Sequence, residues 1–464
     1  MATAHEKALR INLDPTIYGT FAEIGAGQEV ARWFFHVGGA AGTVAETVSA
    51  YDMAVSTARY GQASRFVSRE RLQAMLECEW AKLLERLAPT RGDRCTFFVF
   101  ADTVATRSYS RAEDGSGWLG VRFQTAPGGE ASEVVLHVHL HDPEPVRQQE
   151  DLGLLGLNLL YGTFFHHADP DALIGTLMDG LHRSRVEVDV VAFSGPAFAG
   201  VDNRLVALAL VEQGLTDTTM FTADGAVVQP SEVLYKRAIL LARGAFRPIT
   251  CLGLDILERG RTQFLAEAGL GTEEPVVLTE LSFGDLTTGG GRVDRDDFLA
   301  RADTLRTLGT SVMISRFGRY FALVDHLASY TTRPIGIAIG LPGLARIIDA
   351  SHYDDLAGGL LEAAGRLFKS HVTLYVYPGR GADGARLTID NVLLDPIGRH
   401  LRDYLVAADR LHQIPECTDA YLDLDSADVL DRIRAGDAAW EAMVPPPVAE
   451  VIRRRGLFGW KTGH

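Results

Sequence analysis

Acidic and basic side chains follow several strand-like runs in the second half of this sequence. Asp224 follows the run TTMF, Glu280 and Asp285 follow VVLT, Arg316 follows VMIS, and Arg380 follows LYVY. If the strands are parallel, their carboxyl ends meet at one edge of a sheet and these side chains converge there. Carboxylates beside glycine loops suit Mg²⁺ or acid–base catalysis, and arginines suit bidentate binding of phosphate. We therefore predict a catalytic set (Asp224, Glu280, Asp285) and a substrate-binding pair (Arg316, Arg380), with Mg²⁺ as the candidate cofactor. The alternative is that such residues form turns.

A second candidate lies in the glycine-punctuated segment from Tyr18 to Met53. Gly25 and Gly27 form a G-x-G just before a helix-like run, where free backbone N–H groups can bind a phosphate or carboxylate. We therefore place both glycines among the candidate substrate-binding residues. The segment lacks the third glycine of the dinucleotide-binding spacing, so close helix packing or a subunit interface is the competing interpretation. In either case we expect the segment to be mostly buried.

Three histidines alternate in the run LHVHLH, at positions 137, 139 and 141. Alternation places all three on one face of a strand, where imidazoles can bind zinc or another transition metal. Because residues two apart on a strand diverge by about 7 Å, His137 and His139 can share an ion but all three cannot. A solvated strand face explains the same pattern, and we assign no metal ligands from the sequence.

The pattern of predicted helices and strands that must position these residues changes near residue 145. Before it, an amphipathic helix over 68–87, with Ser68 as its N-cap, precedes strands near 95–105, 118–126 and 133–141, the last two paired antiparallel. After it, strand-like and helical runs alternate at intervals of about 30 residues. The strands are predicted near 186–193, 217–222, 275–281, 310–315, 333–339 and 371–377, and the helices over Asn203–Gln213, Ser231–Arg243, Asp255–Ala268, Asp296–Leu308, Tyr320–Tyr330 and Asp354–Lys369.

This alternation predicts an α/β fold, with a largely parallel sheet flanked by helices and preceded by a smaller α+β N-terminal region. The corresponding domains are 1–145, 146–415 and a helical C-terminal segment over 416–464. That segment ends in a tail with three arginines at 453–455, where the competing interpretations are a disordered tail and one anchored by Phe458 and Trp460.

Composition excludes several classes of protein. The chain has 464 residues, of which 47% are hydrophobic and 23% charged, and its net charge is −15. This balance disfavours binding to nucleic acid or to an anionic membrane surface. No apolar run approaches the length of about 20 residues that a membrane span needs, and the first residues lack the apolar core of a secretory peptide. Four cysteines without a C-x-x-C motif fit a reducing compartment, so we expect a cytoplasmic protein.

Several long segments resemble a bacterial protein family of about this length. They are YGTFAEIGAGQEVARWFF, GGAAGTVAETVSAYDM, FTADGAVVQPSEVLYKRAILLARGAFRP, SRFGRYFALVDHLASYTTRPIGIAIG and GRLFKSHVTLYVYP. Members carry automatic names such as nicotinate-nucleotide adenylyltransferase or TonB-dependent receptor, and the resemblance implies no particular reaction. The former requires an H-x-G-H pair and an I-S-S-T-x-x-R segment, and the latter requires many amphipathic strands and a signal peptide. The sequence has none of these.

Two functions from different classes remain. The first is a cytoplasmic enzyme acting on a phosphorylated or nucleotide-like small metabolite at the strand ends. The second is a homo-oligomeric structural or scaffold protein, with the glycine-rich segment and the basic tail as assembly surfaces. A cleft lined by ionisable groups favours the enzyme, whereas large self-complementary apolar surfaces favour the scaffold. The abundance of Asp, Glu and Arg after the strands leads us to prefer the enzyme.

Overall fold

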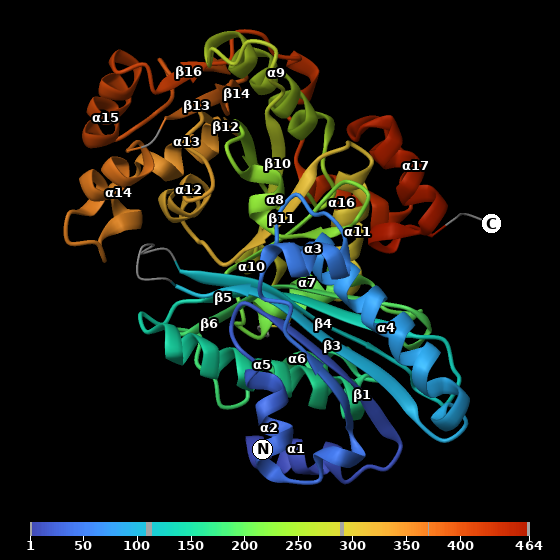
Figure 1. The fold of residues 1–464 in the computed structure, drawn as a ribbon. Helices are drawn as coiled ribbons and strands as arrows, with labels where there is room; N and C mark the ends of the chain where they lie inside the picture. Colours follow the sequence, from blue (N-terminus) through green and yellow to red (C-terminus); the bar gives the residue numbers. More distant parts are fainter. Residues whose placement is uncertain (1, 108–113, 288–291, 370, 462–464) are drawn as a thin grey trace. The chain divides into compact units, whose positions relative to one another are not determined.

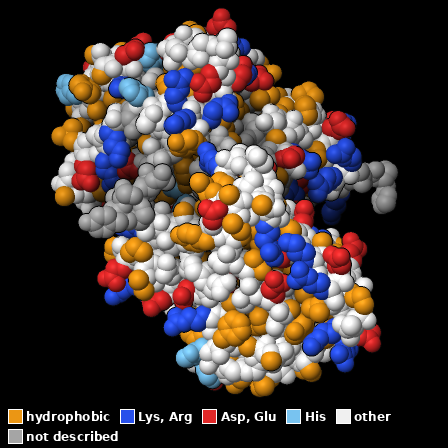
Figure 2. Space-filling model, viewed as in Figure 1, with side chains coloured by type: hydrophobic (Ala, Val, Ile, Leu, Met, Phe, Trp, Pro, Cys, Tyr) orange, Lys and Arg blue, Asp and Glu red, His pale blue; other side chains and the backbone are white. Residues whose placement is uncertain are grey.

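The chain forms two compact units, Met1–Asp217 and Thr218–His464, in a computed structural model that describes residues 2–107, 114–287, 292–369 and 371–461. Figure 1 colours the first unit from blue to green and the second from green to red. Side chains of both charges lie on the visible surface of each unit (Figure 2). Within the described ranges, no helix has the length and apolar character that crossing a membrane requires.

The first unit is a six-stranded mixed sheet with helices packed on it. The strand order is β2-β1-β3-β4-β5-β6; β1 is parallel to β2 and β3, and the pairs from β3 to β6 are antiparallel. The elements are α1 (Ala4–Asn12), β1 (Ile17–Ile24), α2 (Glu29–Val37), β2 (Val44–Val48), α3 (Met53–Tyr60), α4 (Arg69–Arg91), β3 (Thr96–Ala105), β4 (Gly115–Phe123), β5 (Ser132–Leu140), α5 (Pro145–His166), α6 (Pro170–Leu177), β6 (Val186–Ser194) and α7 (Asn203–Glu212).

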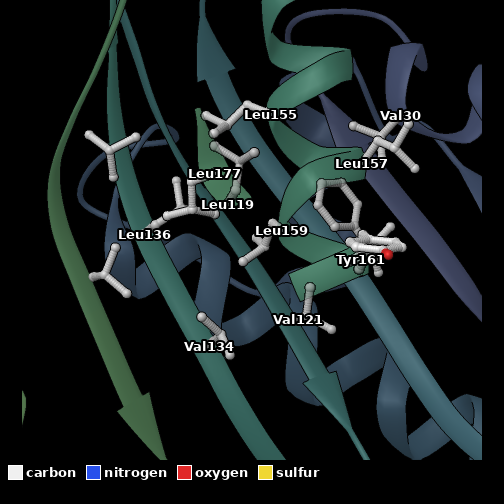
Figure 3. Close-up of a cluster of buried hydrophobic side chains, with 14 of the residues drawn as sticks. Val30, Leu119, Val121, Val134, Leu136, Leu155, Leu157, Leu159, Tyr161 and Leu177 are labelled. Carbon is white, nitrogen blue, oxygen red and sulfur yellow. The ribbon is translucent and has the colours of Figure 1, made fainter. Parts of the chain in front are cut away.

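Local sequence explains the main helices of this unit. The Ser68 side chain accepts a hydrogen bond from the Arg71 N–H and so caps α4, as predicted. Helix α5 lies close to α2 because it presents Gly153 and Gly156, where a Cβ atom would overlap Glu29 and Val30 of α2. Figure 3 shows the resulting core, in which apolar side chains of α5 face those of β4 and β5.

The segment from Tyr18 to Met53 is buried only in part. Strand β1 and the inward face of α2 are largely buried, as expected, whereas Phe35, His36 and the glycines after α2 are exposed. Phe35 is 55% exposed. Burial therefore follows the strand and the inward face of one helix rather than the whole glycine-rich stretch.

The second unit is a doubly wound sheet. The elements are β7 (Thr218–Phe221), β8 (Val227–Val228), α8 (Pro230–Leu234), β9 (Ile239–Arg243), α9 (Cys251–Glu267), β10 (Val276–Ser282), α10 (Phe283–Leu286), α11 (Arg295–Arg306), β11 (Ser311–Ser315), α12 (Tyr320–Ala328), β12 (Ile335–Gly340), α13 (Leu341–Ile348), α14 (Gly359–Leu367), β13 (Val372–Tyr377), β14 (Gly379–Arg380), β15 (Arg386–Leu387), α15 (Pro396–Ala407), β16 (Leu411–Gln413), α16 (Ser426–Ala435) and α17 (Pro446–Arg455).

The main sheet of this unit has the order β16-β13-β12-β9-β10-β11-β7-β8, and all pairs from β16 to β11 are parallel. The chain runs outward from β9 through β10 to β11 and then returns to β12 on the other side of β9. Strand order therefore reverses between β9 and β12, as in the 3-2-1-4-5-6 order of doubly wound folds. Ile239 and Leu241 of β9 pack against the helices α12 to α15, whereas Leu240 faces α9, so helices cover both faces. The α/β prediction is confirmed.

The structure corrects two predicted elements. Ser231–Arg243 is not one helix but the short α8 followed by β9, the strand from which the chain winds in both directions. The run ILLA is buried on both faces, and such a continuous apolar run looks alike in a helix and in a central parallel strand. Strand β6 pairs antiparallel with β5, so residues 146–217 pack in the first unit rather than joining the parallel sheet.

The C-terminal segment packs on the second unit. Phe458 is only 9% exposed and the rings of Trp440 and Trp460 lie 5.3 Å apart. Arg455 forms an ion pair with the buried Asp303 of α11 at 2.5 Å. The interpretation in which aromatic residues anchor the tail and arginines meet acidic groups is therefore confirmed within this unit.

Candidate functional site

A cleft of about 650 Å³ opens in the second unit where the strand order reverses. Most of its lining residues lie at or just beyond the carboxyl ends of four neighbouring parallel strands. Ligands of doubly wound proteins bind at this place, because the connections from adjacent strands diverge to opposite faces there. The lining residues are Arg243, Gly244 and Ala245 at or just beyond the end of β9, Ser282 and Asp285 at or just beyond the end of β10, Gly318, Arg319 and Tyr320 after β11, Pro342, Gly343, Arg346 and Ile347 after β12, and His352 and Tyr353.

Arg243 is fixed in the floor of this cleft by an ion pair with Glu280. Its Nε and Nη2 atoms lie 2.5 and 3.0 Å from the two carboxylate oxygens, and Nη2 also donates to the Phe317 carbonyl at 2.6 Å. Glu280 is fully buried and accepts a further hydrogen bond from the Ser315 hydroxyl at 2.5 Å. The guanidinium lies 4.9 Å from the centre of the Tyr320 ring. Glu280 therefore orients Arg243 and has no access to a ligand.

The cleft walls carry further positive charge. Arg319 pairs with the exposed Asp355, with Nη1 at 3.1 Å from the carboxylate, and lies over the Tyr353 ring. Arg346 is exposed and has no ion-pair partner among the residues that the structure describes. Asp285 supplies the one carboxylate among the lining residues just named. Burial raises the pKa of the Tyr320 hydroxyl to about 12, so this group stays protonated near neutrality.

Two helices begin beside the cleft without a side-chain cap. Helix α12 starts after Arg319 and α13 after Gly340, and neither residue caps its helix with a side chain. A Thr or Asp side chain caps α9, α11, α15 and α16, whereas α8, α10, α14 and α17 also begin without a side-chain cap, so the position beside the cleft distinguishes α12 and α13 from α8, α14 and α17. An uncapped helix start offers N–H donors and a partial positive charge to an anion.

The structure places the predicted residues at different points. Asp285 lines the cleft, and Glu280 lies buried beneath it. Arg316 lies at the same edge of the sheet, with its guanidinium 5.3 Å from the centre of the Phe283 ring, and does not line the cleft. Arg380 also lies at this edge, where it pairs with Asp423 at 2.9 Å. Asp224 lies at the opposite edge, because β7 runs antiparallel to β11 and its carboxyl end points the other way.

Gly25 and Gly27 belong to the first unit and serve a turn between β1 and α2. Gly25 has φ of +107°, and a Cβ atom there would lie 1.7 Å from the Val104 carbonyl oxygen. The helix start that follows is already satisfied, since the Glu23 carboxylate accepts hydrogen bonds from the N–H groups of Val30 and Ala31 at 3.0 and 2.9 Å. A side chain of the protein thus occupies the anion position that the motif suggested.

Sequence reasoning did not find Arg243, Arg319, Tyr320 or Arg346. Arg243 ends a strand and precedes a glycine, so the rule that selected Arg316 applies to it once β9 is recognised as a strand. Arg319 and Tyr320 begin α12 directly after the β11 connection, and Arg346 lies inside α13, a helix that the sequence did not predict. For Arg346 the only sequence signal is Pro342 near a helix start.

No protein-family model matches the chain, and no curated protein matches it in sequence. Among solved structures, the competence/damage-inducible protein CihA from Agrobacterium tumefaciens is 21% identical, with 34% of this chain and 97% of that chain covered and a TM-score of 0.26. A CinA superfamily protein from Klebsiella pneumoniae is 13% identical, covering 36% of this chain and 99% of that one at a TM-score of 0.26. Nicotinic acid mononucleotide adenylyltransferase from Plasmodium falciparum is 12% identical, covering 48% and 98% at 0.30. Similarity at this level concerns part of the fold and carries no functional argument.

Proposed function

We propose that the cleft of the second unit binds a small anionic metabolite of the phosphorylated or nucleotide-like class, and that the protein is an enzyme acting on it. The observation that carries this proposal is that positively charged side chains gather at the point where the strand order reverses. Arg243, Arg319 and Arg346 reach one cleft at the point where doubly wound proteins bind ligands. The starts of α12 and α13 add uncapped N–H donors to the same place.

Each group has a distinct role in this proposal. Arg346, which has no carboxylate partner in the described chain, binds the anion directly, whereas Arg243 is held rigid by Glu280 and presents a preoriented positive charge. Asp285 is the candidate for binding Mg²⁺ together with phosphate oxygens of the ligand, or for transferring a proton. Arg316 and Arg380 flank the cleft at the same sheet edge and remain candidates for contacts to a longer substrate. Asp224, Gly25 and Gly27 take no part in this site.

The test is a thermal-shift and calorimetric survey of the full chain with ATP, AMP, NAD and inorganic phosphate, each with and without Mg²⁺. We expect at least one nucleotide or phosphate to raise the melting temperature. The variant Arg346→Ala should remove the rise, and Arg454→Ala, which removes an exposed arginine from α17, should retain it. Glu280→Gln should also remove the rise while the protein stays folded. A rise that persists unchanged in Arg346→Ala would place the ligand elsewhere.

A second candidate function, self-association as a scaffold, is favoured by one specific surface. A concavity of about 810 Å³ between α14 and α15 is lined mainly by apolar side chains. Leu361, Ile397 and Tyr404 on its rim are 80%, 58% and 68% exposed. An apolar surface of this kind marks a contact site. Light scattering should then report a mass above 50.4 kDa that falls to the monomer in Leu361→Glu, and a monomeric wild-type chain would reject the scaffold function.

A further inference from the structure

A bulge in the first unit brings an aspartate to the histidine face of β5. His137 pairs with Val190 of β6, and the next residue, Val138, pairs with Val188, so Asp189 is the extra residue in the bulged strand. Bulges re-aim side chains in this way. Asp189 therefore lies opposite the two alternating histidines, His137 and His139, although neither strand pattern alone places it there.

The three side chains converge closely in a buried position. The Asp189 carboxylate has one oxygen 2.6 Å from His137 Nδ1 and the other 3.0 Å from His139 Nε2. The ligand-type atoms of the three residues all lie within 4.8 Å of one another. His137 and Asp189 are only 5% and 4% exposed, which excludes the solvated strand face that the sequence also allowed.

The surroundings hold this cluster in place. Trp118 of β4 pairs with His137 across the sheet and its ring centre lies 4.9 Å from the imidazole centre. His139 is only partly buried, so the cluster is open on that side. His141, the next histidine on the same face, is held separately by Asp114 and Glu187, at 2.8 and 3.3 Å.

Two imidazole nitrogens and one carboxylate oxygen are a ligand set for a divalent transition metal. Bonds of about 2.0–2.2 Å in a tetrahedral site separate ligand atoms by about 3.3–3.5 Å. The two His–Asp contacts therefore need to open by less than about 1 Å around an ion, and ligand atoms that now lie up to 4.8 Å apart need to approach. Metal ligation takes the imidazoles in their neutral form, and a divalent cation then balances the buried Asp189 carboxylate in place of a protonated histidine. The open side beside His139 leaves a coordination position for water or a further ligand.

We propose that His137, His139 and Asp189 form a binding site for one divalent transition-metal ion of the zinc type. The site lies wholly within the first unit and does not depend on the function proposed for the second. It takes imidazole-preferring ions such as Zn²⁺ and Co²⁺ and not Mg²⁺, which prefers oxygen ligands in octahedral geometry.

The experiment is a titration of the untagged, chelator-treated full chain with Zn²⁺ by calorimetry and with Co²⁺ by visible absorption. We expect one equivalent of Zn²⁺ to bind, Co²⁺ to develop the intense bands of a low-coordinate site, and Mg²⁺ to give no signal. His139→Ala and Asp189→Asn should each weaken Zn²⁺ binding more than about 100-fold, because even an outer-shell partner contributes about 10–100-fold. Asp189→Asn preserves side-chain shape and His139 is partly exposed, so both variants are expected to fold, which melting without metal will check.

The matched control is His141→Ala, which removes a histidine from the same strand face but outside the ligand set. It should retain Zn²⁺ affinity within about tenfold, no more than the smallest loss that an outer-shell partner causes. Failure of the wild-type chain to bind Zn²⁺, or equal affinities in His139→Ala, His141→Ala and the wild type, would overturn the proposal and leave the cluster as a His–Asp–His hydrogen-bond network.

Discussion

Replacing Glu280 by methionine should destabilise the second unit far more than replacing Glu280 and Arg243 together. The single variant Glu280→Met leaves the Arg243 guanidinium with the Phe317 carbonyl as its remaining hydrogen-bond acceptor in the floor of the cleft. The Arg243 side chain is 11% exposed and Glu280 is 0% exposed, so water compensates little of the lost pairing. Methionine is close to glutamate in volume, which keeps a cavity from contributing to the loss.

The expected magnitude follows from this burial. Breaking a buried ion pair by removing one partner costs about 3–5 kcal/mol, whereas replacing both partners by apolar residues of similar size is often close to neutral. For a unit of this size, 1 kcal/mol corresponds to about 2–4 °C in melting temperature, so the single variant should melt roughly 10 °C lower. The double variant Arg243→Met with Glu280→Met should recover most of that difference.

Scanning calorimetry of the full chain is the assay, because it can separate the transitions of two units. Chemical unfolding of all four proteins then completes a double-mutant cycle, in which the coupling energy between the two residues should exceed about 2 kcal/mol. A single variant that melts within 2 °C of the wild type, or a double variant that loses the sum of both single losses, would refute the reasoning that Glu280 serves Arg243.

Two further predictions concern the turn between β1 and α2. Burial raises the pKa of Glu23 to about 7, and burial also raises the pKa of its neighbour Asp102. The folded state therefore holds protons that the unfolded state releases, and stability should fall as pH rises from about 4.5 through about 7. The Glu23 share of this fall is roughly 3 kcal/mol at 1.36 kcal/mol per pKa unit. Urea midpoints across this pH range should show a smaller fall in Glu23→Gln. Gly25→Ala should cost at least about 1–3 kcal/mol of stability, because a Cβ atom there overlaps the Val104 carbonyl at a φ of +107°. The matched control is Gly38→Ala, at a φ of +83° with open space around it. Equal urea midpoints for both variants would contradict the overlap argument.

Sequence patterns predicted most of the second sheet because β10, β11, β12 and β13 are short apolar runs that alternate with amphipathic helices. The direction of β7 could not be read from its residues, since TTMF fits a parallel or an antiparallel strand equally well. That ambiguity put Asp224 with Glu280, although the two lie at opposite edges of the sheet. A strand's direction is set by its neighbours and connections, which a local pattern does not contain.

The sequence predicted a residue of the candidate site where the end of a single strand determines the position of that residue. It did not predict residues whose position depends on packing between elements. Asp285 follows β10 and reaches the cleft, as the strand-end rule requires. Arg346 reaches it through the placement of α13 against the sheet, which depends on tertiary contacts. The same holds for Asp189, whose approach to His137 follows from a register shift between two strands and has no local signature in either.

The main sheet of the second unit ends on both sides in very short strands, with two residues in β8 and three in β16. Each edge therefore offers few free backbone groups to another chain, and extended edges are what allow sheets to join into larger sheets and fibrils. Copies of this unit accordingly have little means of associating strand to strand. We therefore expect any assembly of this unit to use surface side chains rather than sheet edges, so that single surface substitutions could change it while the sheet, and the cleft at its centre, stay intact.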